Sequence, residues 1–298
     1  MKLAATIGTD KQPWMIAQGD FNADGKLDLA TPNLGSSDVS ILLGNGDGTF
    51  QAAQPYAAGN NPGALAVGFL NRDRDPDIAV VNTASCDVEI LLGSGNGAFA
   101  PPVSNAVNQS YECTSIAIAD FNGDGKSDIV VGFIHGAQGD GIAVLLGNGD
   151  GSFKPAMVTM ATGKTGYLAI GDVNGDGSPD AVLSFQDGTI GVLLGHGDGT
   201  FESPMQFPAG VVSTAVTLGD LNGDGLLDVV AGGVGSKTIG VLLGNGDGSF
   251  ETGRSWDVAG QTISGIGIGD LNGDSKPDLV VVDYDLDEIS VLLNQSPQ

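Results

Sequence analysis

DFNGDGKSD (120–128) decides the fold, because copies of this acidic stretch recur along the whole chain. The other five copies are DFNADGKLD (20–28), FLNRDRDPD (69–77), DVNGDGSPD (172–180), DLNGDGLLD (220–228) and DLNGDSKPD (270–278). Successive copies begin 49, 51, 52, 48 and 50 residues apart. A fixed period of about 50 residues indicates a repeat architecture, in which each unit buries its apolar face against the next.

A second, glycine-rich motif follows the acidic stretch in each repeat. Its copies are LLGNGDGTF (42–50), LLGSGNGAF (91–99), LLGNGDGSF (145–153), LLGHGDGTF (193–201) and LLGNGDGSF (242–250), and the sixth repeat reads LLNQSPQ (292–298) instead. Glycine adopts positive φ without a Cβ clash, so this motif suits a tight turn between two antiparallel strands.

Each repeat reads as four short strands, called A to D here. In the third repeat, strand A is SIAIAD (115–120), B is DIVVGF (128–133), C is IAVLLG (142–147), and D begins at Phe153. Clusters of Val, Ile and Leu bounded by Gly, Asp and Asn are strand signals, and no segment has a long helical period. The sequence therefore predicts an all-β fold, a six-bladed propeller of four-stranded antiparallel blades that forms one domain over residues 1–298.

The first residues are expected to complete the last blade. Met1 lies 18 residues before Gly19, which is the spacing of Phe153 from Gly171 and of Phe201 from Gly219. Residues 1–8 thus occupy a strand D position with no strands A to C before them, whereas the sixth repeat lacks strand D. Pairing the two would remove two exposed sheet edges.

The acidic stretch has the pattern of a calcium loop. Its oxygen-bearing side chains stand at positions 1, 3, 5 and 9, position 7 can offer its backbone carbonyl, and glycine at position 6 permits a sharp turn. Several carboxylates with no nitrogen or sulfur ligand are what Ca²⁺ prefers. Zinc would need Cys or His, of which the chain has two each.

Three other interpretations of the acidic stretch fit the sequence less well. An EF-hand needs a glutamate at position 12, where this chain has Thr31, Val131, Leu183, Ala231 or Val281. The calcium β-helix suggested by the glycine-rich turns has a nine-residue period. Plain turns would explain Asp, Asn and Gly but have no use for three mutually repelling carboxylates.

The second copy departs from the pattern. Phe69 replaces the first aspartate and Arg74 replaces the glycine. We expect this loop to bind calcium weakly or not at all, with Arg72 or Arg74 pairing with Asp73, Asp75 or Asp77 instead. In the sixth copy Ser275 replaces the glycine, which strains the turn but removes no ligand.

Charge and hydropathy exclude several classes of function. The chain has 36 acidic and 11 basic residues, a net charge of −25, and no apolar run long enough to span a bilayer. Such a chain would be repelled by nucleic acid and by anionic membranes.

Taken together, the six acidic loops and the LLGNGDGTF-type segments resemble the FG-GAP/VCBS repeat family, which includes the propeller heads of integrin α-subunits. The resemblance covers essentially the whole chain. It implies about five Ca²⁺ sites on one face of the propeller and partner binding on the opposite face, and it is not carried to the 69–77 loop. The implied metal ligands are Asp20, Asn22, Asp24, Lys26 (carbonyl) and Asp28; Asp120, Asn122, Asp124, Lys126 and Asp128; Asp172, Asn174, Asp176, Ser178 and Asp180; Asp220, Asn222, Asp224, Leu226 and Asp228; and Asp270, Asn272, Asp274, Lys276 and Asp278.

The two cysteines fall on the face away from the acidic loops. Cys86 lies in the B–C loop of the second blade, and Cys113 lies in the connection into the third blade. These neighbouring positions favour a disulfide, the alternative being two buried free thiols. A disulfide and calcium loops of modest affinity both indicate an extracellular, cell-surface or periplasmic location.

The same face carries the variable loops and most of their aromatic side chains. Trp14, Tyr111, His135, Tyr167 and Tyr284 are candidate ligand contacts there, because an aromatic ring beside polar groups can stack on a sugar or hold a peptide. The alternative is that each ring packs over a loop or seals the hub.

Evidence for catalysis is thin, because no nucleophile elbow, zinc-protease or phosphate-loop motif occurs. A glycosidase pair could still arise among Asp10, Glu112, Asp140, Asp283, Asp285 and Asp287. We therefore favour a calcium-stabilised binding or adhesion module, monomeric or part of a larger protein, that recognises an extracellular protein or a glycan. The alternatives are a carbohydrate-active enzyme (lyase or hydrolase) or lectin, and a structural spacer.

Overall fold

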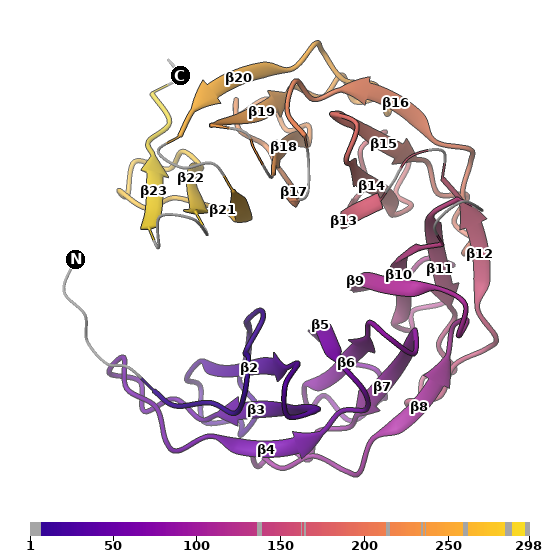
Figure 1. The fold of residues 1–298 in the computed structure, drawn as a ribbon, viewed down its shortest axis with the longest axis vertical. Coiled ribbons are helices and arrows are strands. Elements are labelled where there is room, and N and C mark those ends of the chain that lie inside the picture. Colours follow the sequence, from indigo (N-terminus) through magenta and orange to yellow (C-terminus); the bar gives the residue numbers. More distant parts are fainter. Residues whose placement is uncertain are drawn as a thin grey trace. The chain divides into compact units, whose positions relative to one another are not determined.

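The computed structural model describes residues 7–135, 139–161, 163, 165–212, 215–233, 235, 237–258, 262–283 and 288–295. Within these residues every regular element is a β-strand (Figure 1). The strands form six antiparallel sheets in sequence order, one for each repeat. The predicted all-β, six-bladed propeller of four-stranded antiparallel blades is confirmed.

Equivalent strands recur in every blade with similar bounds. Strand A is β1 (Ala17–Gly19), β5 (Pro62–Gly68), β9 (Glu112–Ala119), β13 (Thr165–Gly171), β17 (Ala215–Gly219) and β21 (Ile263–Gly269). Strand B is β2 (Asp28–Asn33), β6 (Asp77–Asn82), β10 (Asp128–Ile134), β14 (Asp180–Phe185), β18 (Asp228–Gly232) and β22 (Asp278–Asp283). Strand C is β3 (Asp38–Leu42), β7 (Asp87–Leu91), β11 (Gly141–Leu145), β15 (Thr189–Leu193), β19 (Thr238–Leu242) and β23 (Glu288–Leu292). Strand D is β4 (Gln54–Ala57), β8 (Val103–Ala106), β12 (Met157–Met160), β16 (Met205–Pro208) and β20 (Arg254–Asp257).

The outer strand begins later than its sequence suggests. Phe153 makes only an isolated bridge with Gly147, and β12 begins at Met157. The four other four-stranded blades repeat this arrangement, with an isolated bridge between the first glycine of the turn and the phenylalanine. Strand D therefore starts four residues after the phenylalanine rather than at it, because the intervening residues leave the ladder.

The sixth sheet has three strands among the described residues, in the order β21–β22–β23. The segment expected to complete it, residues 1–8, lies almost entirely outside the described residues, which begin at Ile7. The chain divides into two compact units, the first comprising Met1–His135 with Ile142–Val158 and the second Gly136–Gly141 with Thr159–Gln298. The first unit holds nearly all of blades one to three, and the second holds blades four to six.

Within each unit, neighbouring blades bury apolar side chains against one another. Ala30, Val39 and Ile41 of the first blade pack with Ile78 and Leu91 of the second. The same positions of blades four and five form an equivalent cluster. In the second and third blades, strands B and C are buried on both faces and read as nearly continuous apolar runs. The outer strand β12 instead alternates between exposed and half-buried positions. The blade core thereby holds the A–B loop at a fixed end of each sheet.

Candidate calcium loops

The backbone of each acidic loop turns sharply at position 6. Its φ is +79° at Gly25, +76° at Gly125, +87° at Gly177 and +85° at Gly225. Arg74 and Ser275 adopt the same left-handed conformation, with φ of +78° and +65°. Side chains with a Cβ are strained there, so the expected strain at Ser275 is present, and it extends to Arg74.

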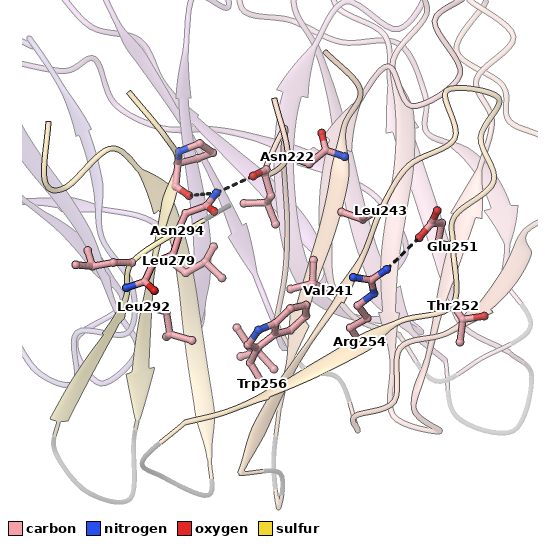
Figure 2. A pocket seen from close by; sticks show the side chains of 15 residues that line it. Asn222, Val241, Leu243, Glu251, Thr252, Arg254, Trp256, Leu279, Leu292 and Asn294 are labelled. Atoms are coloured by element: carbon pink, nitrogen blue, oxygen red, sulfur yellow. Dashed lines mark hydrogen bonds and ion pairs between the residues drawn. The ribbon is translucent and has the colours of Figure 1, made fainter. Parts of the chain in front are cut away.

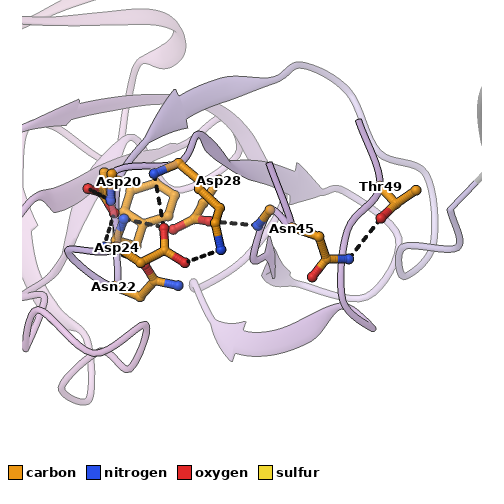
Figure 3. A network of polar contacts seen from close by, with 10 residues as sticks. Asp20, Asn22, Asp24, Asp28, Asn45 and Thr49 are labelled. Atoms are coloured by element: carbon orange, nitrogen blue, oxygen red, sulfur yellow. Dashed lines mark hydrogen bonds and ion pairs between the residues drawn. The ribbon is translucent and has the colours of Figure 1, made fainter. Parts of the chain in front are cut away.

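The first half of the loop is a network of carboxylate-to-backbone hydrogen bonds (Figure 3). In the first loop, Asp20 Oδ1 accepts from the N–H of Asp24 and Oδ2 accepts from that of Gly25, at 3.1 and 2.8 Å. Asn22 Oδ1 also accepts from Asp24, and Asp24 Oδ1 accepts from Lys26, each at 3.0 Å. These bonds hold positions 1, 3 and 5 in one tight turn, so that three oxygen-bearing side chains share a small volume.

The aspartate at position 9 has a different environment. Asp28 is fully buried, its Oδ2 accepting from the N–H of Phe21 and its Oδ1 from that of Gly44, at 2.8 and 2.7 Å. The five other copies repeat both bonds, at Asp77, Asp128, Asp180, Asp228 and Asp278. This carboxylate therefore ties the start of the acidic loop to the end of strand C, a structural role that the metal-ligand interpretation did not include.

In four of the loops, burial shifts the pKa of the position-9 group. It raises the pKa of Asp77, Asp128, Asp180 and Asp228, and the hydrogen bonds from two backbone N–H groups oppose that shift without cancelling it. The exposed position-5 carboxylates of the third and fourth loops have pKa shifts in the opposite direction. A hydrogen bond from the Lys126 side chain lowers the pKa of Asp124, and one from the backbone of Ser178 lowers that of Asp176. The exposed first part of the loop is therefore anionic, whereas the aspartate at position 9 is buried.

Position 7 lies over the glycine-rich turn of its own blade. A Cβ built on Gly46 would meet the Lys26 side chain at 2.8 Å, and one on Gly246 would meet Leu226 at 2.8 Å. In two loops this residue also neutralises position 5, since Nζ of Lys26 lies 3.1 Å from Asp24 and Nζ of Lys126 lies 2.8 Å from Asp124. The A–B loop and the C–D turn of a blade consequently share one end of the sheet.

The second loop keeps only part of this network. Asn71 and Asp73 make the bonds of positions 3 and 5, but Phe69, with 55% of its surface exposed, offers no oxygen. None of the ion pairs found among the described residues joins Arg72 or Arg74 to Asp73, Asp75 or Asp77. Arg72 acts instead on Asp150 of the next blade. Hydrogen bonds from Ser152 lower the pKa of Asp150, and the positive charge of Arg72 lowers it further. The expected local pairing is thus absent.

The donor set of the five complete loops fits Ca²⁺ in chemistry. The ligands available are carboxylate, amide and backbone oxygens, and the backbone already takes the required left-handed turn. In the described residues, however, no three His, Cys, Asp or Glu side chains lie in a metal-binding arrangement. The position-9 carboxylate explains part of this, because it is fully buried and both of its oxygens accept from backbone N–H groups. The position-1 carboxylate also accepts two backbone N–H groups, but it lies at the exposed side of the turn beside positions 3 and 5. An ion would draw mainly on positions 1, 3, 5 and 7.

On the opposite end of the first unit, a disulfide joins Cys86 to Cys113, with the Cα atoms 4.9 Å apart. It links the loop before β7 to β9 and so connects the second blade to the third. Tyr111 lies beside it, stacked on Phe133 at 4.0 Å between ring centroids, with His135 tilted against it at 4.6 Å. The structure therefore brings Tyr111 and His135 together, but one face of the tyrosine is covered.

The other candidate ligand contacts are dispersed. Trp14 is 58% exposed and lines a hollow of about 470 Å³ on the first blade. Tyr167 is half-buried in β13 of the second unit, and Tyr284 lies outside the described residues, as do Asp285 and Asp287. Among the candidate acids, Asp10 and Glu112 are exposed, whereas Asp140 and Asp283 are buried.

Comparisons with known proteins agree on the fold. A lectin from Agrocybe aegerita, described as specifically recognising non-reducing terminal N-acetylglucosamine, matches with a TM-score of 0.62 and 21% identity, over 95% of this chain and 81% of its own. BBS1N, solved in complex with ARL6DN, matches with a TM-score of 0.65 and 15% identity, over 98% of this chain and 82% of its own. No curated protein matches the sequence.

A family model for the FG-GAP-like repeat matches residues 20–80, 70–131, 172–231 and 220–281. Each match spans two successive acidic loops and the strands between them, so the match follows the repeat unit derived above. The chain belongs to the FG-GAP-like repeat family of β-propellers.

Proposed function

We propose that this protein is a calcium-stabilised, extracellular binding module. The observation that carries the proposal is the identical hydrogen-bonded turn in five acidic loops, which gathers the oxygens of positions 1, 3 and 5 at one end of each blade. With a net charge of −25, the loops repel one another and gain from any divalent cation.

The expected energetics assign these ions a structural role. Extracellular calcium modules have Kd values of about 10⁻⁴–10⁻³ M. At about 2 mM calcium and a Kd of about 0.1 mM, one site adds about 1.8 kcal/mol to the free energy of unfolding. Five independent sites would add up to about 9 kcal/mol, which is comparable with the whole stability of a typical domain. Cytosolic calcium would leave such sites empty, which favours an extracellular, cell-surface or periplasmic location.

Calcium titration of the metal-stripped protein tests this proposal. Isothermal titration calorimetry should give about five sites, and elemental analysis of the protein purified in calcium should agree. The matched control is a variant with Asp→Asn at position 1 of the five complete loops (residues 20, 120, 172, 220 and 270), which removes charge but keeps an oxygen at each position. No measurable binding by the parent protein, and no metal after purification, would contradict the proposal.

For the bound partner, we propose the end of the blades opposite the acidic loops. Tyr111 and His135 are half-buried there and pack over the buried disulfide and the buried Phe133, which leaves a partly exposed aromatic pair. Aromatic rings with polar edges suit either a sugar ring or a protein side chain. The structural neighbours include a lectin and a protein-binding domain, and at 21% and 15% identity they support the shared fold rather than one ligand.

A glycan is the second candidate and has a direct test. The protein should be screened on a glycan array and by pull-down from extracellular fluid, in calcium and in chelator, with Tyr111→Ala as the variant. Tyr56→Ala is the matched control, because Tyr56 packs between blades rather than on this surface. Sugar binding that is lost in Tyr111→Ala alone identifies a lectin, and cleavage of the bound sugar would identify an enzyme. Retention of all binding by Tyr111→Ala would place the site elsewhere.

A further inference from the structure

The chain contains eight Asn–Gly pairs, each in a loop at the end of a blade that carries the acidic motif. Four of them occupy positions 3 and 4 of acidic loops (122–123, 174–175, 222–223 and 272–273), and four lie in glycine-rich turns (45–46, 96–97, 148–149 and 245–246). Asparagine is a thermolabile residue, and a glycine after it leaves the backbone nitrogen free of steric hindrance from a Cβ. Each pair is therefore a candidate for spontaneous deamidation.

Deamidation involves two groups that hydrogen bonds can restrain. The backbone nitrogen of the following residue attacks Cγ of the asparagine, a new C–N bond closes a succinimide ring, and the bond from Cγ to Nδ2 breaks. The proton of the attacking N–H leaves with Nδ2 as ammonia, and water then opens the ring at either carbonyl to give aspartate or isoaspartate. A hydrogen bond from the attacking N–H or from the leaving Nδ2 must be broken first, which slows the reaction by about tenfold for each bond.

Hydrogen bonds restrain seven of the eight pairs. In the fourth, fifth and sixth loops, the glycine N–H donates to the position-1 aspartate at 2.7 Å, and the asparagine Nδ2 donates to the position-5 aspartate at 2.8, 2.8 and 3.2 Å. In three of the turns, Nδ2 donates at 2.9 Å to a hydroxyl, that of Thr49, Ser152 or Ser249. In the fourth turn, the N–H of Gly97 donates to the carbonyl of Phe21 at 2.8 Å.

The eighth pair, Asn122 and Gly123, has neither of these bonds, and both residues lie in the described part of the chain. The backbone does not account for the difference, because φ is +69° at Gly123 and +75° at Gly175. Asn122 Oδ1 accepts from the N–H of Asp124 at 2.9 Å, as its counterparts in the other loops do from theirs. Both the attacking nitrogen and the leaving amide are therefore unrestrained in this pair alone.

The residue at position 7 explains why Asn122 lacks the bond from Nδ2. Nζ of Lys126 lies 2.8 Å from Oδ2 of Asp124, which is the oxygen that accepts from the asparagine in other loops. The first loop shows the same exchange, since Lys26 pairs with position 5 at 3.1 Å and Asn22 Nδ2 makes no bond. The asparagine keeps its bond where position 7 is not a lysine, in the second, fourth and fifth loops. In the sixth loop, which also has a lysine there, the bond is the longest, at 3.2 Å.

Solvent exposure does not single out the same pair. Asn122 and Asn174 are both half-buried, and each is followed by an exposed glycine. Asn222 is more exposed, and it lines an apolar groove of about 490 Å³ in the second unit (Figure 2). If exposure controlled the reaction, Asn222 would react before Asn122, so the order of reaction separates hydrogen bonding from exposure.

We propose that Asn122 is a site of spontaneous deamidation and the first of the eight pairs to react. The product at position 3 is aspartate, which adds a carboxylate to the loop, or isoaspartate, which lengthens the loop backbone by one carbon. Either product alters the oxygen that position 3 offers beside Asp120 and Asp124. The effect on calcium binding rests on the proposed function, but the reaction itself does not. The third loop is therefore the one that changes first as the protein ages.

Prolonged incubation of the full chain in chelator, in mildly alkaline buffer at physiological temperature, tests the proposal. Mass spectrometry of its peptides should show the mass increase of deamidation at Asn122 at a rate at least about tenfold higher than at Asn174, Asn222 or Asn272. Equal rates, or a faster reaction at any other Asn–Gly pair, would overturn the proposal.

Two variants test the physical reason, with melting curves at the start of incubation to establish that each is folded. Lys126→Ser gives position 7 the residue of the fourth loop, so Asn122 should bond to Asp124 and react about tenfold more slowly. Gly123→Ala gives the pair the sequence of the first loop, where Ala23 has a left-handed φ of +56°. It should also slow the reaction, because a Cβ hinders attack by the backbone nitrogen. An unchanged rate in Lys126→Ser would show that the ion pair does not control the site and would contradict the proposal.

Repeating the incubation in calcium separates this proposal from the proposed function. If Asn122 Oδ1 binds an ion, the side chain is held in place and calcium should slow the reaction. The same rate in calcium and in chelator would count against Asn122 as a calcium ligand, while the faster reaction at Asn122 in chelator would still support the modification site.

Discussion

Two neighbouring acidic loops of the first unit share their residues at positions 3, 5 and 9 but differ at positions 1 and 6. The loop at 120–128 has all its oxygen-bearing positions, whereas the loop at 69–77 has Phe69 at position 1 and Arg74 in a left-handed conformation. Yet Asp128 and Asp77 are equally buried and accept the same two backbone N–H groups. The comparison separates two tasks within one motif, since positions 1 to 7 are suited to an ion and position 9 holds the blade together.

The largest effect should come from removing calcium altogether. We expect a chelator to lower the free energy of unfolding by as much as about 9 kcal/mol if five sites act independently, which calorimetric melting curves would measure. Asp120→Ala should then reduce the calcium content by one ion, and Phe69→Ala should leave it unchanged. If both variants lost the same amount of calcium, the prediction that the third loop binds an ion and the second does not would be wrong.

Replacing position 9 should weaken both loops through lost hydrogen bonds, and in the third loop it should weaken calcium binding as well. Asp77→Ala and Asp128→Ala each leave two backbone N–H groups without an acceptor, at a cost of about 1–3 kcal/mol per group. Denaturant titration should give the same loss for Asp77→Ala in calcium and in chelator, whereas the loss for Asp128→Ala should be greater in calcium. If Asp77→Ala unfolds like the parent, position 9 has no structural role.

Restoring the missing residues of the second loop should make its stability and its calcium binding more like those of the third loop. Arg74→Gly relieves a left-handed conformation, which costs a residue with a Cβ about 1–2 kcal/mol, so its melting temperature should rise even in chelator. Adding Phe69→Asp should then raise the calcium content by one ion. The reciprocal variant Gly125→Arg is the control, with destabilisation expected. A repaired loop that gains stability but no ion would show that position 1 does not determine binding.

The smallest effect concerns strand C, where the second blade has Glu89 and the third has Ala143. Glu89 is 9% exposed, and burial, followed by the charge of Asp87, raises its pKa. A raised pKa means that the folded state holds the proton more tightly, so its stabilising contribution is complete below the unfolded pKa and declines as the pH rises through the folded value. Glu89→Gln should therefore raise the melting temperature more at pH 7 than at pH 4. An equal gain at both pH values would contradict this assignment.

The fold could be predicted from the sequence because the same pattern of strands and turns recurs six times. Period, strand order and the left-handed turns all follow from local residue types. The start of strand D did not, because Phe153 looks like a strand residue and only its single bridge with Gly147 shows that the ladder resumes later. Local propensity cannot report where pairing resumes after a turn.

The candidate site was predictable in its residues but not in all their roles. The bonds of Asp28 join it to residues 7 and 16 positions away, a geometry that spacing alone does not reveal. One signal was present, since aspartate persists at position 9 even in the second copy, where position 1 is lost. Likewise, Arg72 acts on the next blade, so its influence depends on packing rather than on sequence proximity.

The doubly bonded aspartate at position 9 has a consequence for how such a protein can change over generations. Because this side chain secures the sheet without help from the metal, a single loop can drift away from ion binding while its blade stays folded. The number of blades in a propeller of this kind is then no guide to the number of ions it carries. If the proposed ions bind, each blade can tune its dependence on calcium separately, and the second repeat, with Phe69 and Arg74 in its loop, would depend on calcium least.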